Sequence, residues 1–168
     1  MLNYEALIEQ AKVREMPVTK MRGVLREYLQ ILLLKEIYAS DIGKNLYFTG
    51  GTYLRLAHNT KRFSEDLDFN AVKLTEKGFR QLIGDAAGEL KRTGIAVSEE
   101  YSRRDEMHTA RLIFPDVEGK YAVKSQYSRK EGIVLKVEAN NSRLRAKTET
   151  LVVSGFGQVF PCICSDKG

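Results

Sequence analysis

The stretch at positions 46–70, LYFTGGTYLRLAHNTKRFSEDLDFN, constrains the fold of this chain most strongly. Its order predicts a short apolar strand, a Gly-Gly-Thr turn at 50–52, a brief helix, and a second strand that carries Asp66 and Asp68. Because successive side chains of a strand point to opposite faces, these two aspartates share one face, and the apolar residues beside them face a core. The sequence therefore predicts a pair of carboxylates close to a glycine turn.

Such a pair and such a turn suggest a particular kind of site. Neighbouring carboxylates repel each other, and a fold usually tolerates them where a cation lies between them. A glycine turn that opens a helix can present backbone N–H groups to phosphate. We expect the amides of Gly50, Gly51 and Thr52 to bind nucleotide phosphates, with the Thr52 hydroxyl as a further donor. The alternative is a tight strand-to-helix turn that needs glycine only for its geometry.

Two polar residues precede the aspartate strand. Arg62 and Ser64 lie close enough to it in sequence to contact the phosphates or the base of a bound nucleotide. The alternative is a solvated loop arginine and an ordinary turn serine.

A later apolar segment, 133–139, carries a second charged pair. In a strand, Lys136 and Glu138 point to the face opposite their apolar neighbours. Charged groups flanked by valine and leucine are costly to bury without partners. We therefore expect Glu138 to ligate metal or position an acceptor hydroxyl, and Lys136 to neutralise triphosphate oxygens. The alternative is a sheet whose outer face simply meets water.

The remaining pattern predicts helices first and strands afterwards. Helices are expected at about 3–15, 19–40 and 75–92, and strands follow from position 95 onward, including one at 121–127. This order favours an α+β fold in which N-terminal helices pack on a mixed or antiparallel sheet. We expect one compact domain, with a helical segment at 1–42 packed on a core at 43–168.

The composition limits the setting in which the chain acts. A net charge of +5 and a pI near 9.2 favour a polyanionic partner such as RNA. No apolar run is long enough to cross a membrane, and the N-terminus lacks the apolar core of a signal peptide. Cys162 and Cys164 are spaced poorly for zinc or a disulfide, so reduced thiols are expected. We predict a cytoplasmic protein with no membrane partner.

The motif GGTYLRL followed by RFSEDLDF resembles the opening motif of the polymerase-beta-type nucleotidyltransferases, and it is similar in particular to the AbiEii/AbiGii toxin family. The resemblance implies a polymerase-beta-like fold and transfer of NMP from an NTP to an acceptor. It also implies the toxin role in a toxin–antitoxin pair, with a cognate antitoxin as partner; some members add nucleotides to tRNA. Such transfer usually needs two Mg²⁺ ions, or Mn²⁺, for which Asp66, Asp68 and Glu138 are the expected ligands. The family commonly has aspartate where this chain has Glu138.

The resemblance covers about 19–165, and we expect the chain to lack the C-terminal helical region in which family members normally continue. Two rival functions remain open at this point. One is a catalytically idle module of the same fold that binds RNA or a protein. The other is a nucleotidyltransferase that acts on a protein hydroxyl or on a small molecule such as an aminoglycoside.

Overall fold

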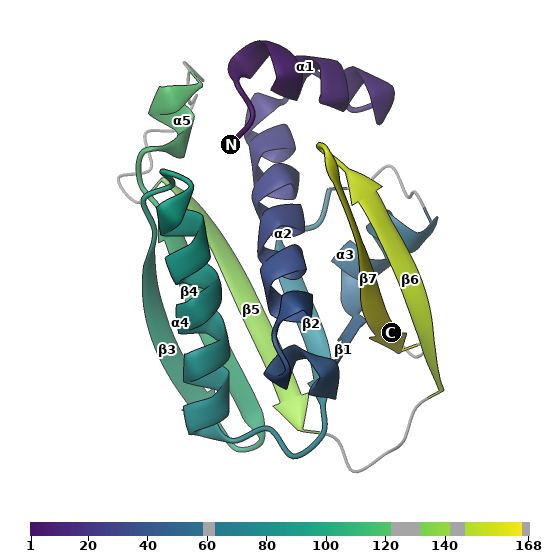
Figure 1. Ribbon diagram of the computed structural model, residues 1–168, viewed down its shortest axis with the longest axis vertical. Coiled ribbons are helices and arrows are strands. Elements are labelled where there is room, and N and C mark those ends of the chain that lie inside the picture. Colours follow the sequence, from purple (N-terminus) through teal and green to yellow (C-terminus); the bar gives the residue numbers. More distant parts are fainter. Residues whose placement is uncertain (59–62, 122–131, 142–146, 166–168) are drawn as a thin grey trace.

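The computed structural model describes residues 1–58, 63–121, 132–141 and 147–165, in which helices pack on one mixed sheet (Figure 1). The helices are α1 (Tyr4–Val13), α2 (Met21–Ala39), α3 (Gly50–His58), α4 (Glu76–Arg92) and the short α5 (Val117–Lys120), with a 3₁₀ turn at Ile42–Asn45. The strands are β1 (Leu46–Thr49), β2 (Asp66–Ala71), β3 (Ser98–Arg104), β4 (Met107–Phe114), β5 (Ile133–Asn141), β6 (Thr148–Gly155) and β7 (Gln158–Ser165). The predicted α+β class is confirmed.

Two helices begin where the sequence places a capping side chain. Asn3 accepts a hydrogen bond from the Ala6 N–H at 2.8 Å, and Thr75 accepts one from the Gly78 N–H at 3.0 Å. Side-chain oxygens at these positions satisfy backbone donors that have no partner within the helix. The starts of α1 and α4 are therefore fixed by local sequence.

The sheet brings the two predicted charged strands together. Its order is β3-β4-β5-β2-β1-β7-β6, in which β2 runs parallel to β5 and antiparallel to β1. In the β2–β5 register Asp66 lies beside Lys136, and Asp68 lies beside Glu138. All four charged side chains therefore belong to one face of the sheet.

The opposite face of these strands forms the core. Helices α2 and α4 lie across it (Figure 1), and they cover the buried side chains Leu67, Phe69, Leu135 and Val137. The Tyr38 hydroxyl of α2 lies 3.0 Å from the carbonyl oxygen of Leu46 in β1 and 3.0 Å from that of Ile163 in β7, so the two carbonyls share its single proton. Helix α2 thus packs directly on the sheet.

Some element boundaries differ from the predictions. The strand expected from Ile95 begins at Ser98, because the Ile95 N–H still donates to the Leu90 carbonyl at the end of α4. The helical turn α5, which follows β4, lies in the region where only strands were predicted. The strand expected at 121–127 lies outside the described residues except for Tyr121, which forms a turn. Within the described ranges, no helix has the length and apolar character needed to cross a membrane.

Candidate functional site

The glycine turn between β1 and α3 packs directly against the predicted site residues. Gly50 has a φ of +80°, and a Cβ atom at this position would lie 2.5 Å from Asp68 Oδ2. A Cβ atom on Gly51 would lie 3.0 Å from Ser64 Oγ. Gly50 is therefore required by its backbone conformation, and a side chain there would also displace the Asp68 carboxylate. A side chain at Gly51 would need only a small shift of the Ser64 hydroxyl.

Thr52 has a different role from the expected one. Its side chain is 1% exposed, and its hydroxyl donates a hydrogen bond to the backbone carbonyl of Asp66. A hydroxyl has a single proton to donate, so this arrangement leaves none for a phosphate. The Thr52 side chain instead connects α3 to the first residue of β2.

Asp66 and Asp68 are partly buried on the face away from α2 and α4. Burial raises the pKa of Asp66, an effect that Lys136 opposes and Glu138 reinforces. Burial also raises the pKa of Asp68, and the negative charges of Glu138 and Asp66 raise it further. The ionised pair is therefore unfavourable in this fold by itself, and a bound cation would relieve the repulsion.

Lys136 and Glu138 form an ion pair on the neighbouring strand. Lys136 Nζ lies 2.5 Å from Glu138 Oε1, and the side chains are 44% and 23% exposed. The hydrogen bond and the charge of Glu138 raise the pKa of Lys136, so the amine stays protonated. The ion pair therefore involves the Glu138 carboxylate, which was expected to be a metal ligand together with Asp66 and Asp68.

The carboxylates fit a magnesium ion only in part. Among the described residues, no three His, Cys, Asp or Glu side chains lie close enough together to hold a metal ion. Asp66 and Asp68 nevertheless supply two adjacent oxygen ligands, and Mg²⁺ in proteins commonly takes one or two carboxylates together with substrate phosphates and waters. The residues of β2 therefore fit a magnesium–nucleotide complex, while the ligand role of Glu138 stays a prediction.

A hollow of about 680 Å³ begins at the Lys136–Glu138 pair and crosses β4 to the turn between β3 and β4. Neither Asp66 nor Asp68 lines it, and it meets the site only through Lys136 and Glu138 of β5. Its other lining residues are Ser102, Arg104, Asp105, Glu106, Met107, Thr109, Arg111 and Asn140.

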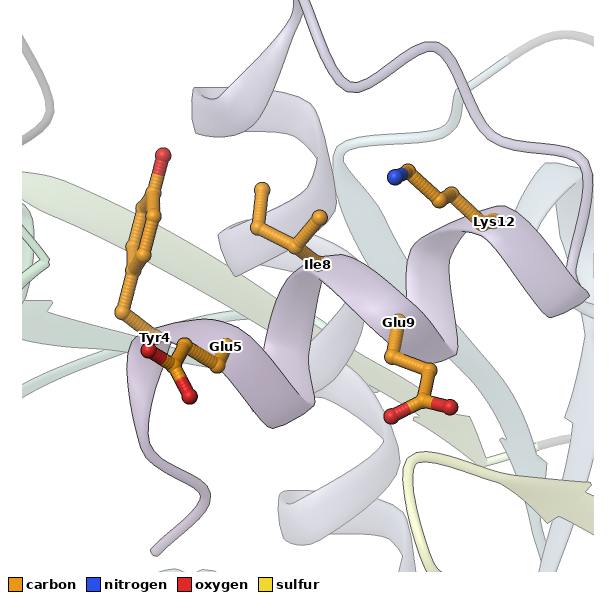
Figure 2. Close-up of a pocket in the computed structure, with 5 residues that line it drawn as sticks. All are labelled: Tyr4, Glu5, Ile8, Glu9 and Lys12. Atoms are coloured by element: carbon orange, nitrogen blue, oxygen red, sulfur yellow. The ribbon is translucent and has the colours of Figure 1, made fainter.

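A second hollow, of about 430 Å³, lies on α1 and has no connection with this chemistry. All of its lining residues come from that one helix, and Figure 2 shows them along its surface: Tyr4, Glu5, Ile8, Glu9 and Lys12. A hollow lined by a single helix is a surface groove, and we assign it no function.

The two remaining predicted residues precede β2. Arg62 lies outside the described residues. Ser64 is partly buried, and its backbone carbonyl accepts a hydrogen bond of 2.9 Å from Gln30 Nε2 of α2. Its hydroxyl faces Gly51, as the close approach at that glycine shows.

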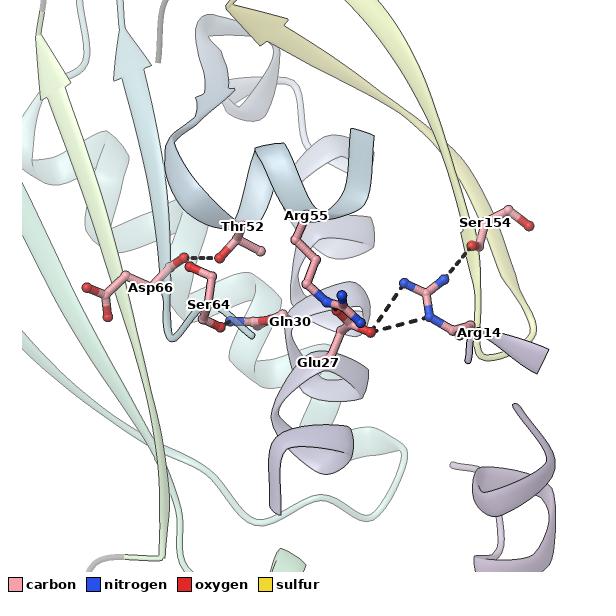
Figure 3. A network of polar contacts seen from close by, with 8 residues as sticks. All are labelled: Arg14, Glu27, Gln30, Thr52, Arg55, Ser64, Asp66 and Ser154. Atoms are coloured by element: carbon pink, nitrogen blue, oxygen red, sulfur yellow. Dashed lines mark hydrogen bonds and ion pairs between the residues drawn. The ribbon is translucent and has the colours of Figure 1, made fainter. Parts of the chain in front are cut away.

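The polar residues of α2 behind the site were not predicted from the sequence. Glu27 and Gln30 are 3% and 2% exposed, and Figure 3 shows Glu27 between Arg55 of α3 and Arg14. The available signal was their position in an otherwise apolar helix, where buried polar residues require partners.

Fold and site geometry together define the class of protein. A nucleotidyltransferase fold is expected to contain a strand, a glycine turn and a helix that pack on a strand with two aspartates, as they do here. Solved structures of nucleotidyltransferases align with this chain. MenT4, a nucleotidyltransferase toxin from Mycobacterium tuberculosis, aligns with a TM-score of 0.57 and 20% identity over 98% of this chain and 54% of its own. A candidate nucleotidyltransferase from H. pylori aligns with a TM-score of 0.53 and 21% identity over 82% of this chain and 52% of its own.

The family assignment rests on the sequence itself. Residues 32–154 match the family described as "Nucleotidyl transferase AbiEii toxin, Type IV TA system", so the chain belongs to that family. No curated protein matches the sequence. The chain spans about half the length of the solved structures that it matches.

Proposed function

We propose that this chain is a Mg²⁺-dependent nucleotidyltransferase that moves NMP from an NTP to an RNA acceptor, the 3′ end of a tRNA being the preferred one. The observation that carries the proposal is the contact between Gly50 and the Asp68 carboxylate. It brings a turn suited to phosphate next to a carboxylate pair suited to a metal ion. Family membership and the fold of MenT4 support the same chemistry.

Each residue has a defined part in this proposal. Asp66 and Asp68 hold Mg²⁺, or Mn²⁺, and Glu138 is the candidate for a further ligand if two ions bind. When bound, the metal neutralises phosphate charge and lowers the pKa of the attacking hydroxyl. The backbone amides of Gly50, Gly51 and Thr52 bind the β- and γ-phosphates.

Lys136 contributes a positive charge to triphosphate binding. Its amine is protonated and lies on the strand beside Asp66, where it can attract phosphate oxygens. Arg62 and Ser64 are the candidates for contacts with the base or with phosphate.

The net charge of the chain supports an RNA acceptor, and the family description supports an antitoxin partner. The chain has a net charge of +5, and an excess of basic groups favours an acceptor that is rich in phosphate. The family is described as a toxin of a toxin–antitoxin system, so a cognate antitoxin is the protein partner that we propose.

One observation favours a second candidate function. Glu138 is engaged by Lys136, and no third acid joins Asp66 and Asp68 among the residues described. A catalytically idle module of the same fold would have the same arrangement, and it would bind RNA or protein without needing Mg²⁺.

The test is transfer of label from each α-labelled NTP into total cellular RNA and protein in the presence of Mg²⁺. The variants are Asp66→Ala and, as a matched control, Asp85→Ala, which removes an exposed acid of α4. We expect wild type and the control to label RNA and Asp66→Ala to label nothing. Labelling that persists in Asp66→Ala would refute the assigned role of Asp66, and no labelling by wild type would favour the idle module.

A further inference from the structure

Four residues on one side of α2 contact the elements that carry the candidate site. Gly23, Arg26, Glu27 and Gln30 follow the spacing of three and four residues that brings helix positions onto one side. We call these four residues the α2 stripe. Their contacts divide into one group on α3 and another on the segment 63–66 that leads into β2.

The first contact holds α3. Glu27 Oε1 accepts a hydrogen bond of 2.5 Å from Arg55 Nε, and the two side chains are 3% and 8% exposed. Arg55 belongs to α3, the helix that begins at the Gly50 turn. A buried, charge-assisted pair of this kind is shorter and stronger than a neutral hydrogen bond, so it fixes the place of the helix relative to α2.

The second group of contacts holds the segment before the aspartates. Gln30 Nε2 donates to the Ser64 carbonyl at 2.9 Å, and Arg26 forms an exposed ion pair of 3.3 Å with Glu65. The Phe63 ring lies against Gly23, where an added Cβ would come within 3.1 Å of it. Each residue from 63 to 65 therefore contacts the α2 stripe.

Arg55 and Phe63 also connect the two groups. The Arg55 guanidinium lies 5.1 Å from the centre of the Phe63 ring, a cation–π contact between α3 and the segment 63–66. Thr52 adds its hydrogen bond to the Asp66 carbonyl (Figure 3). The glycine turn and the aspartate strand are thus held to one side of a single helix.

We infer that the α2 stripe positions the Gly50 turn relative to Asp66 and Asp68, with Glu27 and Gln30 as positioning residues. Neither side chain reaches the open face of the sheet, so both act through Arg55 and Ser64. The effect on catalysis rests on the proposed function, because a displacement of about 1 Å at reacting groups can cost a factor of about 100 in rate.

The structure supplies a matched control for this inference. Arg14 pairs with the same Glu27 carboxylate at 3.3 Å, but its guanidinium also donates to the Ser154 carbonyl of β6 at 2.9 Å. Replacing Arg14 removes one arginine from Glu27 and leaves Arg55 in place. Arg14→Ala should therefore lower stability without moving the site.

The experiment compares Glu27→Gln, Gln30→Leu and Arg14→Ala in the full chain. Gln30→Leu keeps the side-chain size within the core, so it remains informative if Glu27→Gln fails to fold. Amide hydrogen exchange is measured for α3 and for 63–66, and kcat and KM for the NTP are measured in the labelling assay. We expect exchange in these two segments to rise about tenfold or more in Glu27→Gln and Gln30→Leu, and to stay near wild type in Arg14→Ala.

We expect kcat to separate Glu27→Gln and Gln30→Leu from Arg14→Ala in the same way. In the two stripe variants kcat should fall about 10- to 100-fold, whereas Arg14→Ala should stay within about twofold of wild type. Equal losses in all three variants, in proportion to their stabilities, would overturn the inference and indicate general destabilisation. If wild type transfers no label, the proposed function fails, and hydrogen exchange alone decides the positioning role. In that case, equal amide exchange of α3 and 63–66 in all three variants would refute the positioning role.

Discussion

The packing of Gly50 on Asp68 leads to a prediction that can be worked out from the structure. Gly50→Ala places a methyl group 2.5 Å from Asp68 Oδ2 and 3.0 Å from Asp68 Cβ, in a residue with a φ of +80°. A non-glycine residue in this backbone region costs about 1–3 kcal/mol. The displaced carboxylate should add a penalty of its own, because an ordinary van der Waals contact is nearer 3.5–4.0 Å.

These two costs can be separated by a double-mutant cycle. Asp68→Ala removes the carboxylate, so Gly50→Ala in that background should retain the backbone cost and lose most of the steric one. We expect a coupling free energy of about 0.5–3 kcal/mol between the two positions. The assay is urea unfolding of the four proteins followed by far-ultraviolet circular dichroism.

Gly88→Ala provides the control for the cycle. A Cβ atom at Gly88 of α4 would meet no atom within 4 Å, and alanine is favoured over glycine in a helix by about 1 kcal/mol. Gly88→Ala should therefore stabilise the protein in the same assay. Additivity of Gly50→Ala and Asp68→Ala within about 0.5 kcal/mol would refute the claim that the turn packs on the carboxylate.

Three further predictions follow from the same contacts. Because the pKa of Asp68 in the fold is raised above 3.8, the folded state binds more protons than the unfolded chain, and its stability falls as pH rises from 3.8 through the raised pKa. Asp68→Asn should therefore be more stable than wild type at pH 7 in EDTA, and the difference in urea unfolding should vanish below about pH 3.8. Tyr38→Phe removes the hydroxyl that contacts β1 and β7 and should cost about 1–2 kcal/mol in the same assay; no change would contradict those hydrogen bonds. Lys136→Met should weaken NTP binding while changing the unfolding free energy by less than about 1 kcal/mol, because its pair with Glu138 is partly exposed; unchanged affinity would remove Lys136 from the site.

Local patterns were sufficient to predict much of the fold. The two-residue alternation around Asp66 and Lys136 predicted strands with charged residues on one face, and the structure places both on the same face of adjacent strands. The glycine turn was predicted from its position between an apolar strand and a helix. Both features depend on residues that are close together in sequence, which explains why the sequence was sufficient.

The parts that sequence reasoning missed depend on distant partners. Glu27 and Gln30 are polar residues in an apolar helix, and their partners Arg55 and Ser64 are 28 and 34 positions away. Tertiary packing likewise decides that the Thr52 hydroxyl donates to the Asp66 carbonyl, 14 positions away. Alternation placed Lys136 and Glu138 on one face of the strand, but it could not tell whether that face meets solvent or a site. It also could not show that the two side chains pair with each other.

We propose that Asp66, Asp68 and the Gly50 turn bind a metal–nucleotide complex. Equilibrium binding of an NTP tests it most directly, because binding requires no acceptor. Calorimetric titration should be run with and without Mg²⁺ for wild type, Asp66→Asn, Asp68→Asn and the control Asp85→Asn. We expect Mg²⁺-dependent binding by wild type and the control, and loss of that dependence in the Asp66 and Asp68 variants. Binding that is equally strong without Mg²⁺, or unchanged in both of those variants, would contradict the proposal.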